Sequence, residues 1–321
     1  MQLFNKEHVF ILLTERTIRY LTWHSSNIVG QNADYGELVL DSLIIEDGQI
    51  INEELLTSML NNLIEQKNWK RHKLSFIVPD NFVTMRQESI PKQLTKDEIL
   101  SYIELHMDGS IRLPFKNPYI DYHLLEEGED KNKIILFAYP SERLKPFREL
   151  FVDVGLWPNV ADISYLSLYR AYLKAELATK DEHLLMIQWN KYDLTMTVFH
   201  QQTPKFSRHV HLEHAAQSWQ KNEESKQLEW KSSLLTLADF VEEQLIPIER
   251  FIDFYRYSVV SDEGQINQIL ITGDFPNKQI IEDQLMKRFD LPIKKLTLPN
   301  DLPIEFGSLY GLGLRGGRFD Q

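Results

Sequence analysis

The predicted elements of this chain follow one order twice, and each repeat starts with a short hairpin. The first hairpin covers residues 8–21 and the second covers residues 183–198, and both read as a strand, a polar turn and a strand. A third extended stretch, a long helix and another strand follow each hairpin. A sequence organised in this way predicts an α/β protein with two similar lobes, because a repeated supersecondary order indicates a duplicated unit.

Residues 82–155 interrupt this repeat and have no counterpart in the second half. They contain a predicted strand, a helix, two more strands and a second helix. We therefore expect an inserted subdomain at 82–155. The expected remainder is a lobe-one core from residues 1–81 and 156–179, and a second lobe at 180–321 with an outer subdomain at roughly 213–275.

Capping residues mark the expected helix starts. Asn52 is placed as an N-cap before an apolar stripe, and Thr95 with Glu98 forms a capping box. A long helix is predicted over residues 228–257, where Pro247 is expected to kink it or divide it in two.

Composition excludes several classes of function. The net charge of −12 argues against nucleic acid as a partner, because phosphate-backbone binding requires a basic face. The absence of cysteine excludes a disulfide framework and thiolate metal sites. No secretory signal and no run of about 18 apolar residues is seen, so we expect a cytoplasmic protein that reaches a membrane only through a partner.

Three glycines spell a dinucleotide-binding pattern, Gly311, Gly313 and Gly316. That fingerprint requires a preceding strand and a following helix within a βαβ unit, and too few residues remain after it here. The sequence instead predicts close packing of the final helix against a sheet.

A histidine-rich strand offers a weak metal candidate. His209 and His211 alternate on one predicted strand, with His200, Glu213 and His214 nearby. No further ligand has motif spacing, so we expect no metal site and a solvated strand edge.

Residues 67–73 form the one strong basic cluster and include Trp69. The cluster lies where a helix ends, and cations favour that end of the helix dipole without any ligand. Contact with an anion or an acidic partner is the alternative function for this cluster.

Duplicated lobes that each open with a hairpin resemble the actin-like fold, in which the two hairpins grip the phosphates of ATP. From Ser89 onwards the chain is more narrowly similar to the PilM family, actin-like proteins of type IV pilus assembly. The matching segments, in order, are Ile90-Pro91, Leu94, Asp97-Glu98-Ile99, Leu113-Pro114-Phe115, Tyr119-Ile120-Asp121-Tyr122, Leu136-Phe137-Ala138-Tyr139-Pro140-Ser141, Gly155-Leu156-Trp157-Pro158, Asp162-Ile163-Ser164, Glu249-Arg250-Phe251-Ile252-Asp253-Phe254-Tyr255, Thr272-Gly273-Asp274 and Phe306-Gly307-Ser308-Leu309-Tyr310-Gly311-Leu312.

The resemblance implies an RNase H-like core in each lobe, a family-specific subdomain in lobe one and a place in the pilus assembly complex at the inner membrane. It also implies that the cytoplasmic N-terminal segment of a bitopic, PilN-type membrane protein docks beside that subdomain. We expect this segment to contact Val83, Met85 and Ile90, although on alternation alone these side chains are equally suited to fill the insertion's own core.

The nucleotide-binding positions of the family are degenerate in this chain. Where the resemblance implies an acid, small residues and paired glycines, the chain has Leu12, Thr14, Gln188, Asn190, and Gly273 followed by an aspartate. A phosphate nest needs conformations that glycine adopts easily, and a magnesium site needs oxygen ligands. We therefore expect no ATP, no magnesium and no catalysis, and predict a non-catalytic adaptor of a pilus or competence machine.

Two alternatives remain open on the sequence. One is an active actin-like ATPase that uses Glu15, Asp193 and Asp274 as replacement acids. The other is a relative of the division-type or polymer-forming actins, for which the residues after Leu314 supply no amphipathic membrane-targeting tail.

Overall fold

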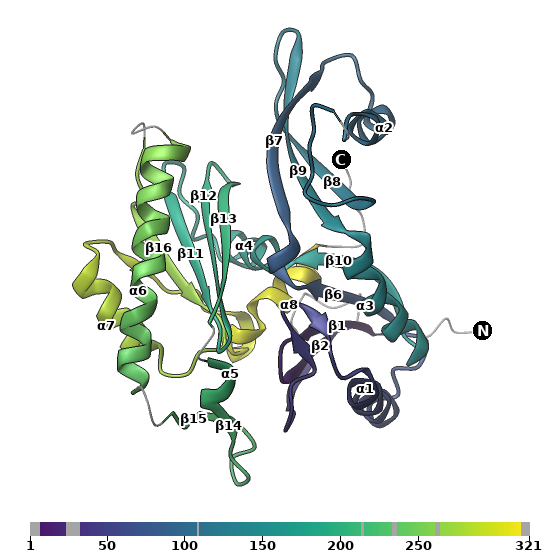
Figure 1. Ribbon diagram of the computed structural model, residues 1–321, viewed down its shortest axis with the longest axis vertical. Helices are drawn as coiled ribbons and strands as arrows, with labels where there is room; N and C mark the ends of the chain where they lie inside the picture. The colour runs from purple at the N-terminus through teal and green to yellow at the C-terminus, as the bar shows by residue number, and fades with distance from the viewer. Residues whose placement is uncertain are drawn as a thin grey trace. The chain divides into compact units, whose positions relative to one another are not determined.

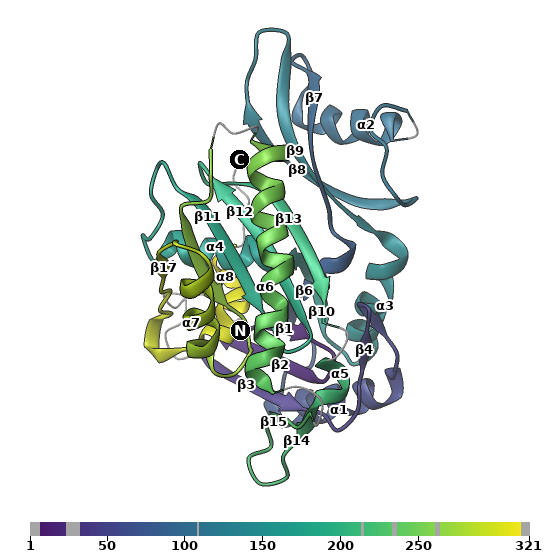
Figure 2. The ribbon, with the colours of Figure 1, turned by 60° about the vertical axis from the view of Figure 1, so that its left-hand side comes forward.

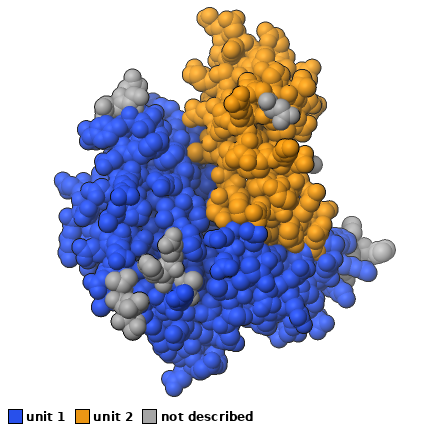
Figure 3. Space-filling model, viewed as in Figure 1, with its two compact units in different colours: residues 1–80, 150–321 blue, residues 81–149 orange. Residues whose placement is uncertain are grey.

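The computed structural model describes residues 7–23, 33–107, 109–212, 215–232, 236–260 and 264–315. The chain forms two compact units, the first from residues 1–80 and 150–321 and the second from residues 81–149 (Figure 3). The second unit overlaps the insertion expected at 82–155 but ends earlier, because the last part of its final helix belongs to the first unit.

The first sheet of the first unit has the strand order β10-β6-β1-β2-β3 (Figure 1). Its strands pair antiparallel within the β1-β2-β3 meander and parallel from β1 through β6 to β10. The elements of this half are β1 (His8–Leu13), β2 (Thr17–Trp23), β3 (Asp34–Val39), β4 (Ile45–Glu46), β5 (Gln49–Ile50), α1 (Glu53–Lys67), β6 (Lys73–Val78), β10 (Trp157–Ile163) and α4 (Ser164–Lys174).

The second sheet repeats this order as β13-β12-β11-β16-β17, with the same pattern of antiparallel and parallel pairs. In Figure 2 the long helix α6 runs across this sheet. The elements are β11 (His183–Trp189), β12 (Asp193–His200), β13 (Thr203–His211), α5 (Ala215–Ser218), β14 (Trp219–Lys221), β15 (Leu228–Trp230), α6 (Leu237–Phe254), a π turn (Tyr255–Val259), β16 (Gln268–Thr272), α7 (Lys278–Arg288), β17 (Ile293–Lys294), two 3-10 turns (Pro299–Asp301 and Ile304–Phe306) and α8 (Gly307–Leu314).

Burial explains why the duplicated strands read as nearly continuous apolar runs. The β11 and β12 strands are buried along almost their whole length, and α6 packs on them through Phe240, Leu245 and Phe251. Strands covered on both faces lose the alternation of apolar and polar residues. A charged residue inside such a strand is therefore unusual.

The predicted helix at 228–257 is wrong at its start. Residues 228–230 form β15, and α6 begins only after Thr236, whose hydroxyl and the Asp239 carboxylate make a capping box. The helix is also continuous through Pro247 rather than divided. The cap at Asn52 is confirmed, since its side chain accepts a hydrogen bond from the Leu55 N–H at 3.1 Å.

The last helix packs closely, as its glycines predict. A Cβ on Gly311 would lie 1.7 Å from the carbonyl oxygen of Ser167 in α4, and one on Gly313 would lie 1.7 Å from the Trp23 ring. Gly316 lies outside the described residues. The spacing of these glycines therefore serves the contact of α8 with α4 and β2.

The second unit has its own sheet, in the order β7-β9-β8, and its own core. Its elements are a 3-10 turn (Asp80–Phe82) at the boundary, β7 (Thr84–Pro91), α2 (Lys96–His106), β8 (Pro118–Glu126), β9 (Lys131–Pro140) and α3 (Ser141–Asp153), which continues into the first unit. The core consists of Ile90, Ile99, Ile103, Ile111, Ile134 and Leu136. Among the described residues, no helix is both long and apolar enough to cross a membrane.

Candidate functional site

The turns of the two duplicated hairpins have the same geometry. The β1–β2 register ends at the pair Leu13 and Ile18, and the β11–β12 register ends at Trp189 and Leu194. The Thr14 N–H donates to the Thr17 carbonyl at 3.0 Å, and the Asn190 N–H donates to the Asp193 carbonyl at 2.9 Å. Leu12 is therefore the structural counterpart of Gln188, and Thr14 that of Asn190.

Each of these positions belongs to a cross-strand row that carries polar side chains. Leu12 pairs with Arg19, which pairs with Glu37 on β3. Gln188 pairs with Thr195, which pairs with His209 on β13. Side chains directly opposite each other in paired strands share one face of the sheet. The two hairpins thus present one polar row from each lobe.

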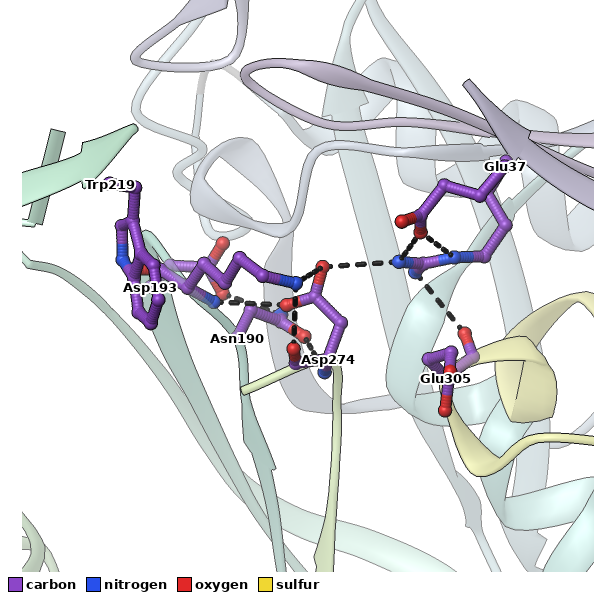
Figure 4. Close-up of polar contacts among 8 residues, drawn as sticks. Glu37, Asn190, Asp193, Trp219, Asp274 and Glu305 are labelled. Carbon is purple, nitrogen blue, oxygen red and sulfur yellow. Dashed lines mark hydrogen bonds and ion pairs between the residues drawn. The ribbon is translucent and has the colours of Figure 1, made fainter. Parts of the chain in front are cut away.

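Asp274 joins these hairpins (Figure 4). One carboxylate oxygen accepts from the Arg19 guanidinium of lobe one at 3.1 Å, and the other accepts from the backbone N–H of Lys191 at 3.0 Å. The Lys191 ammonium lies 3.4 Å from the same carboxylate and donates to the Asp274 carbonyl at 2.8 Å. Arg19 also binds Glu37, donating to it from Nε at 2.9 Å.

The charges around Asp274 are nearly removed from water. The Arg19 side chain is 3% exposed and that of Asp274 is 7% exposed. Burial alone would raise the pKa of Asp274, but Lys191 and Arg19 outweigh it and lower the pKa to about 2. Burial lowers the pKa of Lys278, while Glu305 and Asp274 oppose that effect. Arg19, Lys191 and Lys278 therefore lie around Asp274, which is ionised at neutral pH.

A second set of contacts links the lobes at the ends of β6, β10 and β11. The Ser164 hydroxyl donates to the Asp80 carboxylate and accepts from the Gln188 side-chain amide at 2.6 Å. The Thr195 hydroxyl also donates to Asp80, at 3.3 Å. Burial raises the pKa of Asp80 to about 6, and Ser164 and His209 oppose the shift. The Ser164 hydroxyl thus bridges Asp80 of lobe one and Gln188 of lobe two.

A third set of contacts involves Arg16 in the first hairpin turn. Its guanidinium donates to the carbonyls of Leu40 at 3.0 Å, Asp41 at 2.7 Å and Trp219 at 2.9 Å. The Trp219 indole N–H donates to the Lys191 carbonyl at 2.8 Å, in the second hairpin turn. Arg16 thus connects the first hairpin to β14 of the second lobe.

The structure places the predicted nucleotide positions as follows. Leu12 is a half-buried apolar residue in β1 and supplies no oxygen. The side-chain oxygen of Asn190 accepts from the Asp274 N–H at 3.3 Å, so it is already engaged. Gly273 has φ +97°, and a Cβ there would lie 2.2 Å from the Trp189 carbonyl. A glycine at this position therefore allows the end of β16 to approach the backbone of the second hairpin closely.

The three candidate replacement acids differ in their protonation. Burial and the nearby Asp193 raise the pKa of Glu15 well above its ordinary value. Burial also raises the pKa of Asp193 to about 6, with Asp274 adding to the shift. Asp193 is also largely ionised at neutral pH, because a pKa of about 6 lies below 7. Asp274, which has the lowest pKa of the three, is already bound by Arg19 and Lys191.

The histidine strand does not form a metal site in the described part of the chain. No group of three or more histidine, aspartate and glutamate side chains has the geometry for a metal ion among the residues at 7–23, 33–107, 109–212, 215–232, 236–260 and 264–315. His209 faces Asp193 at 3.9 Å, while Glu213 and His214 lie outside the described residues. The histidine row therefore lines the acid-rich hairpin.

The basic cluster at 67–73 contains residues with clear structural contacts. Trp69 is 1% exposed, and Asn68 ends α1 in the left-handed conformation. The Lys67 ammonium binds Asp34 at 2.7 Å and lies over the Tyr20 ring. Lys70, Arg71 and Lys73 are exposed, so contact of these three cations with an anion stays a prediction.

The candidate partner contacts lie in the second unit with different exposures. Val83 and Met85 are half-buried at the start of β7, whereas Ile90 is fully buried in the core of that unit. Ile90 fills the core, which is the alternative that the alternating pattern left open. A partner cannot reach its side chain without unfolding the unit.

Sequence reasoning missed Arg19, Lys191, Asp80 and Ser164. A signal was present for Arg19, because a charged residue in the middle of an otherwise apolar strand requires a buried partner. No comparable signal exists for Asp80, which follows a strand end in an ordinary loop pattern.

Comparison with known proteins identifies the architecture. A family model described as type IV pilus assembly protein PilM matches residues 14–300. The structure of a PilM–PilN type IV pilus biogenesis complex matches with a TM-score of 0.71 at 14% identity, covering 98% of this chain and 99% of that chain. The ethanolamine utilization protein EutJ from Carboxydothermus hydrogenoformans matches with a TM-score of 0.54 at 7% identity, covering 96% and 89%. No curated protein sequence matches this chain.

A protein from Bacteroides thetaiotaomicron, described as having an actin-like ATPase fold, also matches, with a TM-score of 0.48 at 11% identity and coverage of 95% and 96%. The duplicated sheet order and the matches to the PilM–PilN complex and to EutJ confirm the predicted actin-like fold.

Proposed function

The chain belongs to the PilM family of type IV pilus assembly proteins, and we propose that it serves pilus assembly as a non-catalytic scaffold. The observation that carries this proposal is the engagement of Asp274 by Arg19 and Lys191, between the hairpins that would hold a nucleotide. A scaffold of this kind keeps the two-lobed shape of an actin-like protein without its chemistry.

The proposed absence of catalysis is supported by two features of the site. Leu12 supplies no magnesium ligand at the end of β1, and Gln188 donates its amide to Ser164. Phosphoryl transfer depends on metal ions that neutralise the developing charge and on a residue that positions the nucleophile. A leucine side chain cannot bind a metal ion, and the Gln188 amide is already engaged.

The proposed partner is the cytoplasmic N-terminal segment of a PilN-type bitopic membrane protein. A structure named as a PilM–PilN complex shares this fold along nearly the whole chain, which supports a partner of this class. Through that partner the protein would lie at the inner face of the plasma membrane, in the pilus assembly complex.

We place the segment along β7 of the second unit. Within that unit β7 pairs only with β9, so among the described residues its other edge has no strand partner. An extended peptide can add a strand to such an edge and set alternate side chains into apolar pockets. Val83 and Met85 are half-buried and offer apolar contacts at this edge.

The test is a calorimetric titration with a synthetic peptide that copies the cytoplasmic segment of the PilN-type protein from the same genome. Met85→Glu should weaken binding at least tenfold, worth about 1.4 kcal/mol, because it puts a charge into an apolar contact. Met286→Glu is the matched control, since Met286 is 65% exposed on α7 in the first unit. Wild-type affinity in a folded Met85→Glu protein would contradict this placement, and no heat with the wild-type protein would contradict the partner.

A further inference from the structure

The two lobes of the first unit are joined by few covalent connections. The chain passes from α4 of lobe one to β11 of lobe two through residues 175–182, and it returns through residues 295–306 to α8, which packs on α4, β1 and β6. Two lobes connected in this way can open and close as rigid bodies about the connections. The interactions that cross between the two hairpins then influence how closed the two lobes are.

Asp274 is held in lobe two and aimed at lobe one. Its backbone N–H binds Asn190 at 3.3 Å, its carboxylate accepts from the Lys191 N–H at 3.0 Å, and both partners belong to the second hairpin turn. The same carboxylate reaches Arg19 in the first hairpin at 3.1 Å. Asp274 thus contacts a turn N–H and two cations, as a bound anion would.

The cations between the two hairpins come from both lobes, and the carboxylate that lobe one supplies does not neutralise all of them. Arg19 comes with Glu37 from lobe one, but Lys191 and Lys278 come from lobe two together with Asp274. Without Asp274, Arg19 and the two lysines would lose an ionised partner, and the carboxylates left nearby would be Glu37, Glu305, Glu15 and Asp193. A buried charge that loses its partner is strongly unfavourable.

Other links cross between the lobes independently of Asp274. Asp80 of lobe one accepts from Thr195 of lobe two, Gln188 of lobe two donates to Ser164 of lobe one, and Arg16 of lobe one donates to the Trp219 carbonyl of lobe two. None of these links involves a group that a nucleotide would have to bring. The closed arrangement is therefore complete without a ligand.

We propose that the Asp274 carboxylate is a built-in substitute for a bound anion and holds the two lobes closed in the absence of any nucleotide. This inference rests on the proposed function, in which the scaffold works without a nucleotide. It adds a physical explanation of how the protein stays closed without one. A scaffold that is permanently closed presents one conformation to its partner. The apparent affinity for the partner is then not reduced by a fraction of molecules in an open conformation.

The absence of cysteine allows a direct test of this closure, because an introduced pair of cysteines is unique. Spin labels at Glu54→Cys on α1 and Lys287→Cys on α7 report the distance between the lobes by pulsed EPR, and both positions are exposed. The full chain without ligand should give one narrow distance distribution that 1 mM ATP with magnesium does not change. A broad distribution that ATP or inorganic phosphate narrows would overturn the proposal without any further variant.

Asp274→Ala in this labelled chain should broaden the distribution and shift it to longer distances. Acetate should restore the narrow distribution, because its carboxylate replaces the deleted group, whereas chloride at equal ionic strength should not. Glu249→Gln is the control, since it breaks an exposed ion pair with Arg288 inside lobe two. An unchanged distribution in folded Asp274→Ala, or no rescue by acetate, would contradict the proposal. Peptide binding is a separate readout, so a failure here leaves the partner proposal standing.

Discussion

Asp193, the first residue of β12, and Asp274, two residues after the end of β16, have opposite pKa shifts. Asp274 faces Lys191 and Arg19, which lower its pKa to about 2, whereas burial and the charge of Asp274 raise the pKa of Asp193 to about 6. The sequence alone marks both as equal candidates for a replacement acid. The structure separates them, because their surroundings decide at which pH each one is ionised.

Asp274→Asn is expected to destabilise the protein by about 3 kcal/mol at pH 7, because the amide leaves Arg19 with one anionic partner in a buried site. The lowered pKa of Asp274 means that this stabilisation is present above the ordinary value of 3.8 and is lost as the pH falls towards about 2. Urea unfolding at pH 7 and pH 3 measures the difference. Glu249→Gln, in an exposed pair, should cost less than about 1 kcal/mol.

Asp80→Asn should show the opposite dependence on pH. Burial raises the pKa of Asp80 from 3.8 to about 6, so the folded protein holds this proton more tightly than the unfolded chain. The contribution of Asp80 to stability therefore falls as the pH rises through this interval. Relative to wild type, we expect Asp80→Asn to be more stable at pH 8 than at pH 4 by about 1–3 kcal/mol.

The measurement for Asp80 is the free energy of unfolding at these two pH values, with the exposed Asp97→Asn as the matched change of charge. Equal differences between variant and wild type at both pH values would argue against the raised pKa of Asp80. Such a result would also weaken the assignment of Asp80 as a partly protonated contact to Ser164.

Among the elements, the hairpins and the insertion could be predicted, but the start of α6 could not. Two strands around a polar turn have a strong local pattern, and the capping residue Asn52 acts on its own backbone neighbours. Leu228 and Trp230, the apolar residues at 228–230, fit a helical stripe as well as a strand. Their pairing with residues 219–221 in β14 decides the outcome, and that contact is invisible in the local pattern.

The final helix provides a prediction at this scale. Gly311→Ala should destabilise the protein by about 1–3 kcal/mol, because the new Cβ would overlap the Ser167 carbonyl and force α8 away from α4. Gly109→Ala is the control, since its nearest neighbour would lie at an ordinary 3.7 Å. Thermal unfolding followed by circular dichroism compares the two. An equal melting temperature for both variants would show that α8 does not depend on this close approach.

In the whole molecule, the repeated order of elements predicts the two sheets. The contacts that hold the two lobes together could not be predicted. Each lobe follows from its own patterns, because strands and helices are specified by nearby residues. The link from Arg19 to Asp274 joins positions 255 residues apart. Leu12 indicates that a ligand is lost, but nothing in a single sequence shows that an aspartate has been placed against the cations of both hairpins.

The last prediction concerns nucleotide binding by the entire protein. ATP with magnesium at 1 mM should produce no heat of binding and no rise in melting temperature, because the cations between the hairpins already have the Asp274 carboxylate and Leu12 provides no metal ligand. A ligand at about 100 times its dissociation constant would stabilise the protein by about 2.7 kcal/mol, which a melting experiment detects easily. A dissociation constant in the micromolar range would contradict the non-catalytic scaffold and favour an active ATPase. In that case the affinity for the peptide should be compared with and without ATP. Equal affinities would still support a partner interaction that does not depend on nucleotide.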